Sequence, residues 1–67
     1  MAKIQLNGKK ITIKSKSTIM DLLVKYNLNK KKIAIEYNGK ILPKLKYKKK
    51  YLKNNDNLEI VHFIGGG

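Results

Sequence analysis

The reactive group that this 67-residue chain can present most openly is the carboxylate that ends the run Gly65-Gly66-Gly67. Glycine has no Cβ, so such a tail is thin and can enter a narrow channel in a partner enzyme. A free carboxylate is a poor acyl donor, but its attack on the α-phosphate of ATP gives an acyl-adenylate, from which a sulfur or amine nucleophile can displace AMP. We therefore expect Gly67 to be a cargo-attachment point, and we expect Gly65 and Gly66 to keep the tail that leads to it narrow. A frayed terminus or a leftover linker is the alternative.

The remaining residues offer little catalytic chemistry. The chain has no cysteine and a single histidine, His62, so neither a thiol nucleophile nor a zinc site is expected. A chain of this size has one small core and little room for a deep cleft. The acidic residues show no spacing typical of a carboxylate pair; they are Asp21, Glu36, Asp56 and Glu59. We therefore expect a carrier or cosubstrate that binds no cofactor or metal, and not an enzyme.

The charge of the chain is strongly positive. Sixteen lysines and no arginine give a formal net charge of +12. Three explanations remain open: A/T-rich codons, which favour Lys, Ile and Asn; attraction to an acidic protein partner; and binding to nucleic acid, which the lack of arginine makes less specific. The start of the chain has no apolar signal segment, and no run approaches the length of a membrane span. We expect a cytoplasmic or plastid-stromal protein.

Hydrophobic periodicity predicts the elements that must position the tail. Alternation predicts strands over Lys3–Asn7 and Lys10–Lys14, joined by a tight Asn7-Gly8 turn. A helix should begin at Ser17 or Thr18, with Asp21 completing a capping box. Asn27 or Asn29 should end it. Its apolar face should be formed by Ile19, Leu22, Leu23 and Tyr26.

The second half of the chain predicts three more strands. They cover Ile33–Tyr37, Lys40–Leu42 and Asn57–Ile64, with a turn at Asn38-Gly39 and a stop at Pro43. Between them runs a lysine-dense connection that four apolar or aromatic residues can anchor to the core: Leu45, Tyr47, Tyr51 and Leu52. The fold class is therefore α+β, with one helix packed on a mixed sheet of four to five strands. Residues 1–64 form the domain and residues 65–67 a flexible tail.

The last predicted strand also suggests where a partner docks. If Leu58, Ile60 and with them His62 face the helix, then Val61 and Phe63 face away from it. Exposed apolar side chains beside the tail are candidates for partner docking. Ordinary exposed strand residues are the alternative. The four tyrosines could stack on nucleic-acid bases, but we expect them to pack in the core or at its edge.

Taken in order, these motifs resemble the ThiS family of sulfur carriers of thiamine biosynthesis, which have the ubiquitin-like β-grasp fold. The resemblance covers essentially the whole chain. It rests on Ile4-Gln5-Leu6-Asn7-Gly8, Thr18-Ile19-Met20-Asp21-Leu22-Leu23, Ile33-Ala34-Ile35-Glu36-Tyr37-Asn38-Gly39, Ile41-Leu42-Pro43, Tyr47 and the run from Asp56 to Gly67. The lysine-dense stretch and the general basicity depart from the family pattern as we expect it.

The resemblance implies a route for the cargo. A ThiF-like enzyme, using ATP and magnesium, would adenylate Gly67, and sulfur from a cysteine desulfurase would give a thiocarboxylate. A ThiG-like thiazole synthase would take that sulfur for the thiazole ring. Two other functions remain open from the sequence: a molybdopterin-synthase-type sulfur carrier and a β-grasp RNA-binding module of the TGS type.

Overall fold

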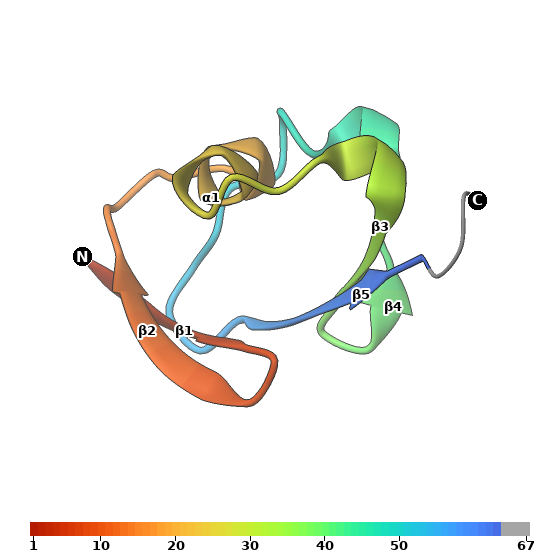
Figure 1. The fold of residues 1–67 in the computed structure, drawn as a ribbon. Helices are drawn as coiled ribbons and strands as arrows, with labels where there is room; N and C mark the ends of the chain where they lie inside the picture. The colour runs from red at the N-terminus through yellow and green to blue at the C-terminus, as the bar shows by residue number, and fades with distance from the viewer. Residues whose placement is uncertain (64–67) are drawn as a thin grey trace.

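The computed structural model describes residues 1–63, in which one helix crosses one face of a five-stranded mixed sheet (Figure 1). The strands are β1 (Ala2–Leu6), β2 (Lys9–Ile13), β3 (Ile33–Tyr37), β4 (Lys40–Ile41) and β5 (Asn57–His62), in the spatial order β2-β1-β5-β3-β4. β5 pairs in parallel with β1 and antiparallel with β3. The strand that leads to the glycine tail therefore lies at the centre of the sheet.

The helix α1 (Ile19–Lys25) begins as predicted. The Thr18 backbone N–H donates to Asp21 Oδ2 at 2.9 Å, and the Asp21 N–H donates to Thr18 Oγ1 at 3.1 Å, which closes the capping box. Asn27 ends the helical segment in the left-handed region, with φ of 55°. Asn29 has a different role: its side chain accepts from the Lys31 N–H and caps the short 3₁₀ helix η1 (Lys30–Lys32).

The prediction that Tyr26 belongs to the apolar face of the helix is wrong. Because α1 ends at Lys25, Tyr26 is the C-cap residue and its side chain is 41% exposed. Leu28 packs against the core from beyond the helix end, and its N–H donates to the Leu23 carbonyl. The apolar periodicity of the sequence continues one residue beyond the last residue of the helix.

The core lies between α1 and the facing side of the sheet. Alternating residues of β1, β3 and β5 enter it together with Ile13 of β2, and Tyr47 and Leu52 of the lysine-dense connection close it. Two of the four predicted anchors are wrong: Leu45 is 91% exposed and Tyr51 is 57% exposed. Leu45 lies in the 3₁₀ helix η2 (Lys44–Lys46), two positions before the buried Tyr47. Residues two positions apart in a 3₁₀ helix point to different sides, so Leu45 and Tyr47 cannot both face the core. Tyr51 alternates with the buried Leu52.

Backbone hydrogen bonds attach the lysine-dense connection to the start of α1. The Met20 N–H donates to the Tyr47 carbonyl at 2.9 Å, and the Leu52 N–H donates to the Ser17 carbonyl at 2.7 Å. Thr18 and Tyr51 form an isolated bridge. Among residues 1–63, no helix is long and apolar enough to cross a membrane.

Candidate functional site

The predicted tail continues from the end of β5. On one side of β5, backbone pairing with β3 and Lys32 fixes the position of this end in the sheet. The Phe63 N–H donates to the Lys32 carbonyl at 2.9 Å, which extends the β3–β5 ladder by one residue past His62. The predicted strand to Ile64 is therefore observed as far as His62. Ile64 and the site residues Gly65, Gly66 and Gly67 lie outside the described residues.

On the other side of β5, a side chain continues the pairing where β1 has ended. The Ile60 N–H donates to Asn7 Oδ1 at 2.7 Å, and Asn7 Nδ2 donates to the Ile60 carbonyl at 3.4 Å. Asn7 also forms the predicted turn with Gly8, and both residues have positive φ. The Asn-Gly pair predicted the turn, but nothing in the local sequence could predict a partner 53 residues away.

A buried carboxylate fixes the beginning of β5. Asp56 Oδ2 accepts hydrogen bonds from the Tyr37 hydroxyl and the Lys53 N–H, both at 2.7 Å, and Asp56 Oδ1 accepts from Asn38 Nδ2 at 3.2 Å. Burial, the hydrogen bond to Asp56 and its negative charge raise the pKa of Tyr37 to about 12. No local pattern around Asp56 predicted this junction between the β3–β4 turn and β5.

The two predicted docking residues are exposed. The side chain of Val61 is 55% exposed and that of Phe63 is 48% exposed, close to the end of β5. Lys44 Nζ lies 5.4 Å from the centroid of the Phe63 ring, which is within the range of a cation–π interaction. His62 is exposed and does not join the core with Leu58 and Ile60. It lies opposite Ile33, at the last position of β5.

The fold brings together two acidic residues that sequence analysis did not pair. Glu36 of β3 and Glu59 of β5 lie directly opposite each other in the ladder. Their neighbours in sequence, Ile35 and Ile60, are buried, so the two glutamates belong to the open face of the sheet. Within residues 1–63, no group of three or more His, Cys, Asp or Glu side chains could hold a metal ion.

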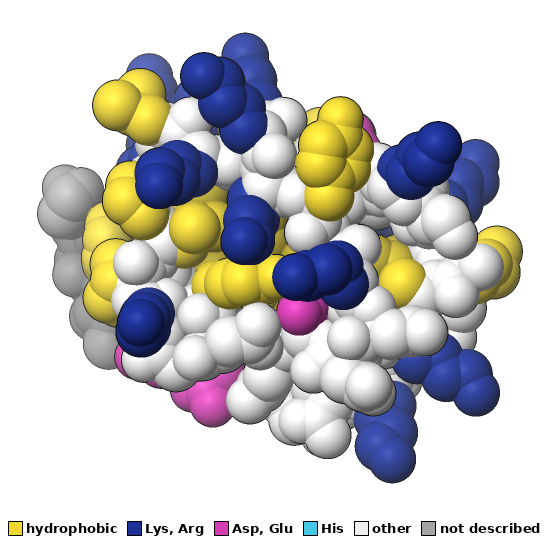
Figure 2. Space-filling view, turned by 180° about the vertical axis from the view of Figure 1, so that it is seen from behind, with side chains coloured by type: hydrophobic (Ala, Val, Ile, Leu, Met, Phe, Trp, Pro, Cys, Tyr) yellow, Lys and Arg dark blue, Asp and Glu magenta, His cyan; other side chains and the backbone are white. Residues whose placement is uncertain are grey.

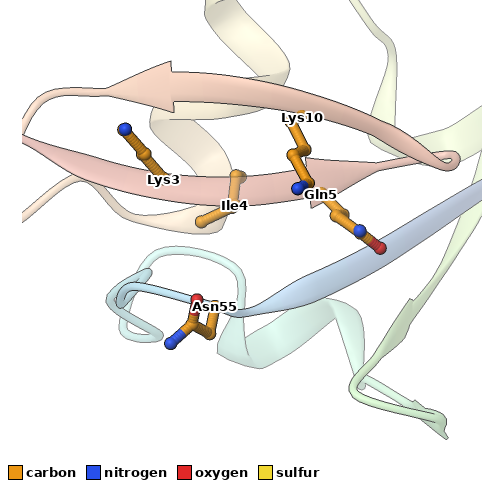
Figure 3. A pocket seen from close by; sticks show the side chains of 5 residues that line it. All are labelled: Lys3, Ile4, Gln5, Lys10 and Asn55. Carbon is orange, nitrogen blue, oxygen red and sulfur yellow. The ribbon is translucent and has the colours of Figure 1, made fainter.

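Two hollows on the described surface are lined by residues outside β5. One, of about 300 Å³, is lined by Lys3, Ile4 and Gln5 of β1, Lys10 of β2 and Asn55 of the turn before β5 (Figure 3). It holds two lysines and two amides but no carboxylate or nucleophile. Figure 2 shows lysine side chains spread over the visible face, with apolar surface between them. Tyr26 and Tyr51 are exposed, at 41% and 57%, and do not pack in the core as predicted.

Comparison with known proteins gives a consistent result. A family model described as "ThiS family" matches residues 4–67. The sulfur carrier protein ThiS of Bacillus subtilis is 45% identical over 65 residues, which cover 96% of this chain and 98% of that protein. A thiazole synthase of Paramagnetospirillum magneticum is 37% identical over 97% of this chain, and the matched segment is 20% of that protein.

A solved structure agrees with the fold. The crystal structure of the thiamine biosynthesis protein (ThiS) from Geobacter metallireducens superposes with a TM-score of 0.82 at 25% identity, covering 97% of this chain and 99% of that one. The five-stranded mixed sheet with its single helix is thus the ThiS-like β-grasp fold. On the family match, which runs to Gly67, and on the similarity to the proteins of Bacillus subtilis and Geobacter metallireducens, the chain belongs to the ThiS family.

Proposed function

We propose that this chain is a sulfur carrier of thiamine biosynthesis, which bears sulfur as a thiocarboxylate on Gly67 and donates it for thiazole formation. The observation that supports this most strongly is the family match over residues 4–67, because it includes the glycine run as well as the folded domain. The near full-length similarity to the Bacillus subtilis sulfur carrier supports the same function. The chain is a carrier that other enzymes act on, and not a catalyst.

The chemistry proceeds in two displacements at the Gly67 carboxyl group. A carboxylate oxygen attacks the α-phosphorus of ATP, and pyrophosphate leaves. A sulfur nucleophile then adds to the acyl-adenylate carbon, and AMP leaves with the oxygen that it acquired. A ThiF-like enzyme would supply the ATP and magnesium site. A cysteine desulfurase would supply the sulfur as a persulfide, and a thiol reductant would cleave the sulfur–sulfur bond so that the thiocarboxylate remains on Gly67. Gly65 and Gly66 keep the approach to the carbonyl carbon free of side chains.

Thiazole synthase is the proposed acceptor of the sulfur. Two relatives named thiazole synthase each contain a segment similar to this chain, about 20% of their length, at 37% and 35% identity. A carrier-like segment within such a polypeptide supports a functional pairing between carrier and synthase. These relatives also favour thiazole formation over molybdopterin synthesis or RNA binding.

Val61 and Phe63 are the proposed docking residues for the enzymes that handle the tail. Their exposure, at 55% and 48%, leaves apolar surface free at the end of β5. Burial of such side chains against a partner would stabilise a complex while the tail occupies the partner's channel.

Reconstitution tests the proposal directly. The full chain is incubated with the adenylating enzyme, ATP, magnesium, a cysteine desulfurase, cysteine and a thiol reductant, and its intact mass is measured. We expect a gain equal to the mass difference between one sulfur and one oxygen atom, located at Gly67 by fragmentation. A variant that lacks Gly66 and Gly67 is the matched control and should not change. An unchanged mass of the full chain, with every enzyme shown to be active on another carrier, would contradict the proposal.

A further inference from the structure

The strand β2 forms one edge of the sheet. The strand order β2-β1-β5-β3-β4 gives β2 a partner on one side only, which is β1 (Figure 1). The strand at the other edge, β4, has two residues, whereas β2 has five. A sheet edge presents a row of backbone donors and acceptors to which a further strand can pair. Because β2 is the longer of the two edges, it offers more of these groups.

The hydrogen bonds of β1 show which backbone groups of β2 are free. The Gln5 N–H donates to the residue before β5 at 2.9 Å, and the Lys3 carbonyl accepts from the turn before β5 at 2.8 Å. Lys3 and Gln5 therefore bond toward β5 and not toward β2. The residues opposite them in β2 are Thr12 and Lys10. Antiparallel pairs alternate between those that exchange hydrogen bonds and those that do not, so the N–H and C=O groups of Lys10 and Thr12 point to the free edge.

A hollow of about 320 Å³ lies beside the end of this edge, between β2 and α1. Two of its lining residues, Ile13 and Leu22, are apolar and only 4% and 2% exposed. Two others are cationic: Lys14 directly follows β2, and Lys25 is in the last turn of α1. The polar lining is completed by Ser17 and Asp21. The hollow thus suits an apolar side chain that has carboxylates near it.

We propose that the edge of β2 accepts an extended acidic segment of a partner protein as an additional strand, with one apolar side chain of that segment in the hollow between β2 and α1. The backbone of the segment bonds the free groups of Lys10 and Thr12. In this mode of recognition, backbone hydrogen bonds supply affinity and pockets for alternate side chains supply specificity. Because β1 separates β2 from β5, this surface is distinct from the end of β5 and does not depend on the chemistry at Gly67.

The charge around the edge selects an acidic segment as the occupant. Three lysines lie along the edge or the hollow, and the one carboxylate there, that of Asp21, already accepts from the Thr18 N–H. Lysines on an edge strand oppose pairing with another positive edge. A second copy of the chain is therefore disfavoured, since each copy carries a formal charge of +12. Single-stranded nucleic acid is disfavoured because its phosphodiester backbone has no donor for the free carbonyl groups of Lys10 and Thr12.

The test uses a synthetic peptide of alternating valine and glutamate, blocked at both ends and slightly longer than β2. The peptide is titrated into the isotope-labelled full chain, and NMR follows chemical shifts and amide hydrogen exchange. In the free chain, the amides of Ile11 and Ile13 should exchange slowly and those of Lys10 and Thr12 rapidly. We expect the peptide to slow exchange at Lys10 and Thr12 and to shift the signals of residues that line the hollow.

Two control peptides separate strand addition from simple attraction of opposite charges. In the first, every backbone nitrogen of the valine–glutamate peptide is methylated, which removes the donors and keeps the side chains and the charge. In the second, lysine replaces glutamate, which reverses the charge and keeps the donors. We expect each control to bind at least roughly tenfold more weakly than the probe, because binding needs both the backbone bonds and the carboxylates.

Variants of the chain test the two parts of the surface separately. Thr12→Pro removes one donor from the free edge, a position at which proline is tolerated, and should weaken binding roughly tenfold. Lys14→Glu with Lys25→Glu reverses the charge at the hollow and should have a similar effect. The matched control, Lys46→Glu with Lys49→Glu, makes the same charge change in the lysine-dense connection and should weaken binding by less than about threefold. Slow exchange at Ile11 and Ile13 verifies that each variant keeps the β1–β2 pairing.

Several results would overturn the inference. They are failure of the probe to bind, equal binding of the methylated peptide, or shifts spread over the lysines of the whole chain without slowed exchange at the edge. A dimer of the free chain, seen by sedimentation, with Lys10 and Thr12 already protected would show that a second copy occupies the edge. Displacement of the probe by a single-stranded RNA, with shifts at the same residues, would show a site for polyanions. None of these results bears on sulfur attachment at Gly67, which the intact mass measures independently.

Discussion

Asp56 shows how a single buried side chain can fix the start of the strand that leads to the tail. Only 4% of the residue is exposed, and it holds donors from Tyr37, Asn38 and Lys53. A buried carboxylate is tolerated when several hydrogen bonds satisfy its oxygens. Asp56 thus joins the β3–β4 turn to β5 and helps to set the direction in which β5 leaves the domain.

Tyr37→Phe removes one of these donors and should lower the free energy of unfolding at neutral pH by about 1.5–3 kcal/mol, the range for hydrogen bonds to charged groups. The pKa of Tyr37 is raised from 10.0 to about 12 in the folded state. Its contribution to stability is therefore complete below pH 10 and is lost as pH rises through 12. Urea unfolding of both proteins should show their stability difference narrowing over this interval. A constant or widening difference would contradict the assignment.

Tyr47 presents the opposite case, a buried hydroxyl without a hydrogen bond of good geometry. The side chain is fully buried, and burial raises its pKa, while the backbone of Ile35 lies near enough to lower it slightly. An unpaired buried hydroxyl is unfavourable.

Tyr47→Phe should therefore raise the free energy of unfolding by about 1 kcal/mol. Chemical denaturation of the variant beside the wild-type chain measures this difference. A loss of stability would show that the hydroxyl has a partner in solution, with the Ile35 backbone N–H as the first candidate.

At the scale of elements, β5 depends on a side chain to replace the partner strand that it loses. β1 pairs with β5 only at Gln5–Asn57 and Leu6–Leu58, and the Asn7 amide then bonds both backbone groups of Ile60. The Asn7 side chain thus holds β5 in the sheet beyond the end of β1. The face of β5 that points away from α1 stays open to a partner.

Asn7→Gly tests this role because glycine accepts the φ of 51° that Asn7 adopts but lacks the amide. We expect a loss of about 1 kcal/mol in stability and faster hydrogen exchange at the Ile60 N–H. Asn27→Gly is the matched control, since Asn27 also has positive φ and directly follows Tyr26, the C-cap residue of α1. Equal effects of the two substitutions would mean that the Asn7 amide contributes nothing specific to β5.

Local patterns in the sequence predicted most of the fold but not the contacts that complete it. The hairpin, the capping box and the order of the elements follow from residues close together in the chain. The pairing of Glu36 with Glu59 and the contact of Asn7 with Ile60 depend on strand order and register, which no short pattern contains. Leu45 and Tyr51 were predicted as anchors because alternation with lysine does not show which apolar residues point inward.

At the scale of the whole molecule, the domain positions one strand and its continuation for use by other proteins. The helix and the lysine-dense connection close one face of the sheet, and no other element of residues 1–63 covers the opposite face (Figure 1). The exposed apolar side chains Val61 and Phe63 were predicted from alternation along β5, and their exposure is confirmed. Their docking role and the chemistry at Gly67 remain predictions.

The central claim is that the chain carries sulfur on the carbonyl carbon of Gly67. Intact-mass and fragmentation spectrometry of the protein isolated from its native host during growth without thiamine tests it most directly. We predict a fraction of molecules that end at Gly67 with one oxygen replaced by sulfur, and we predict that alkylation shifts the mass of this fraction alone. A population that contains only the unmodified carboxylate, under conditions in which thiazole is being made, would contradict the account.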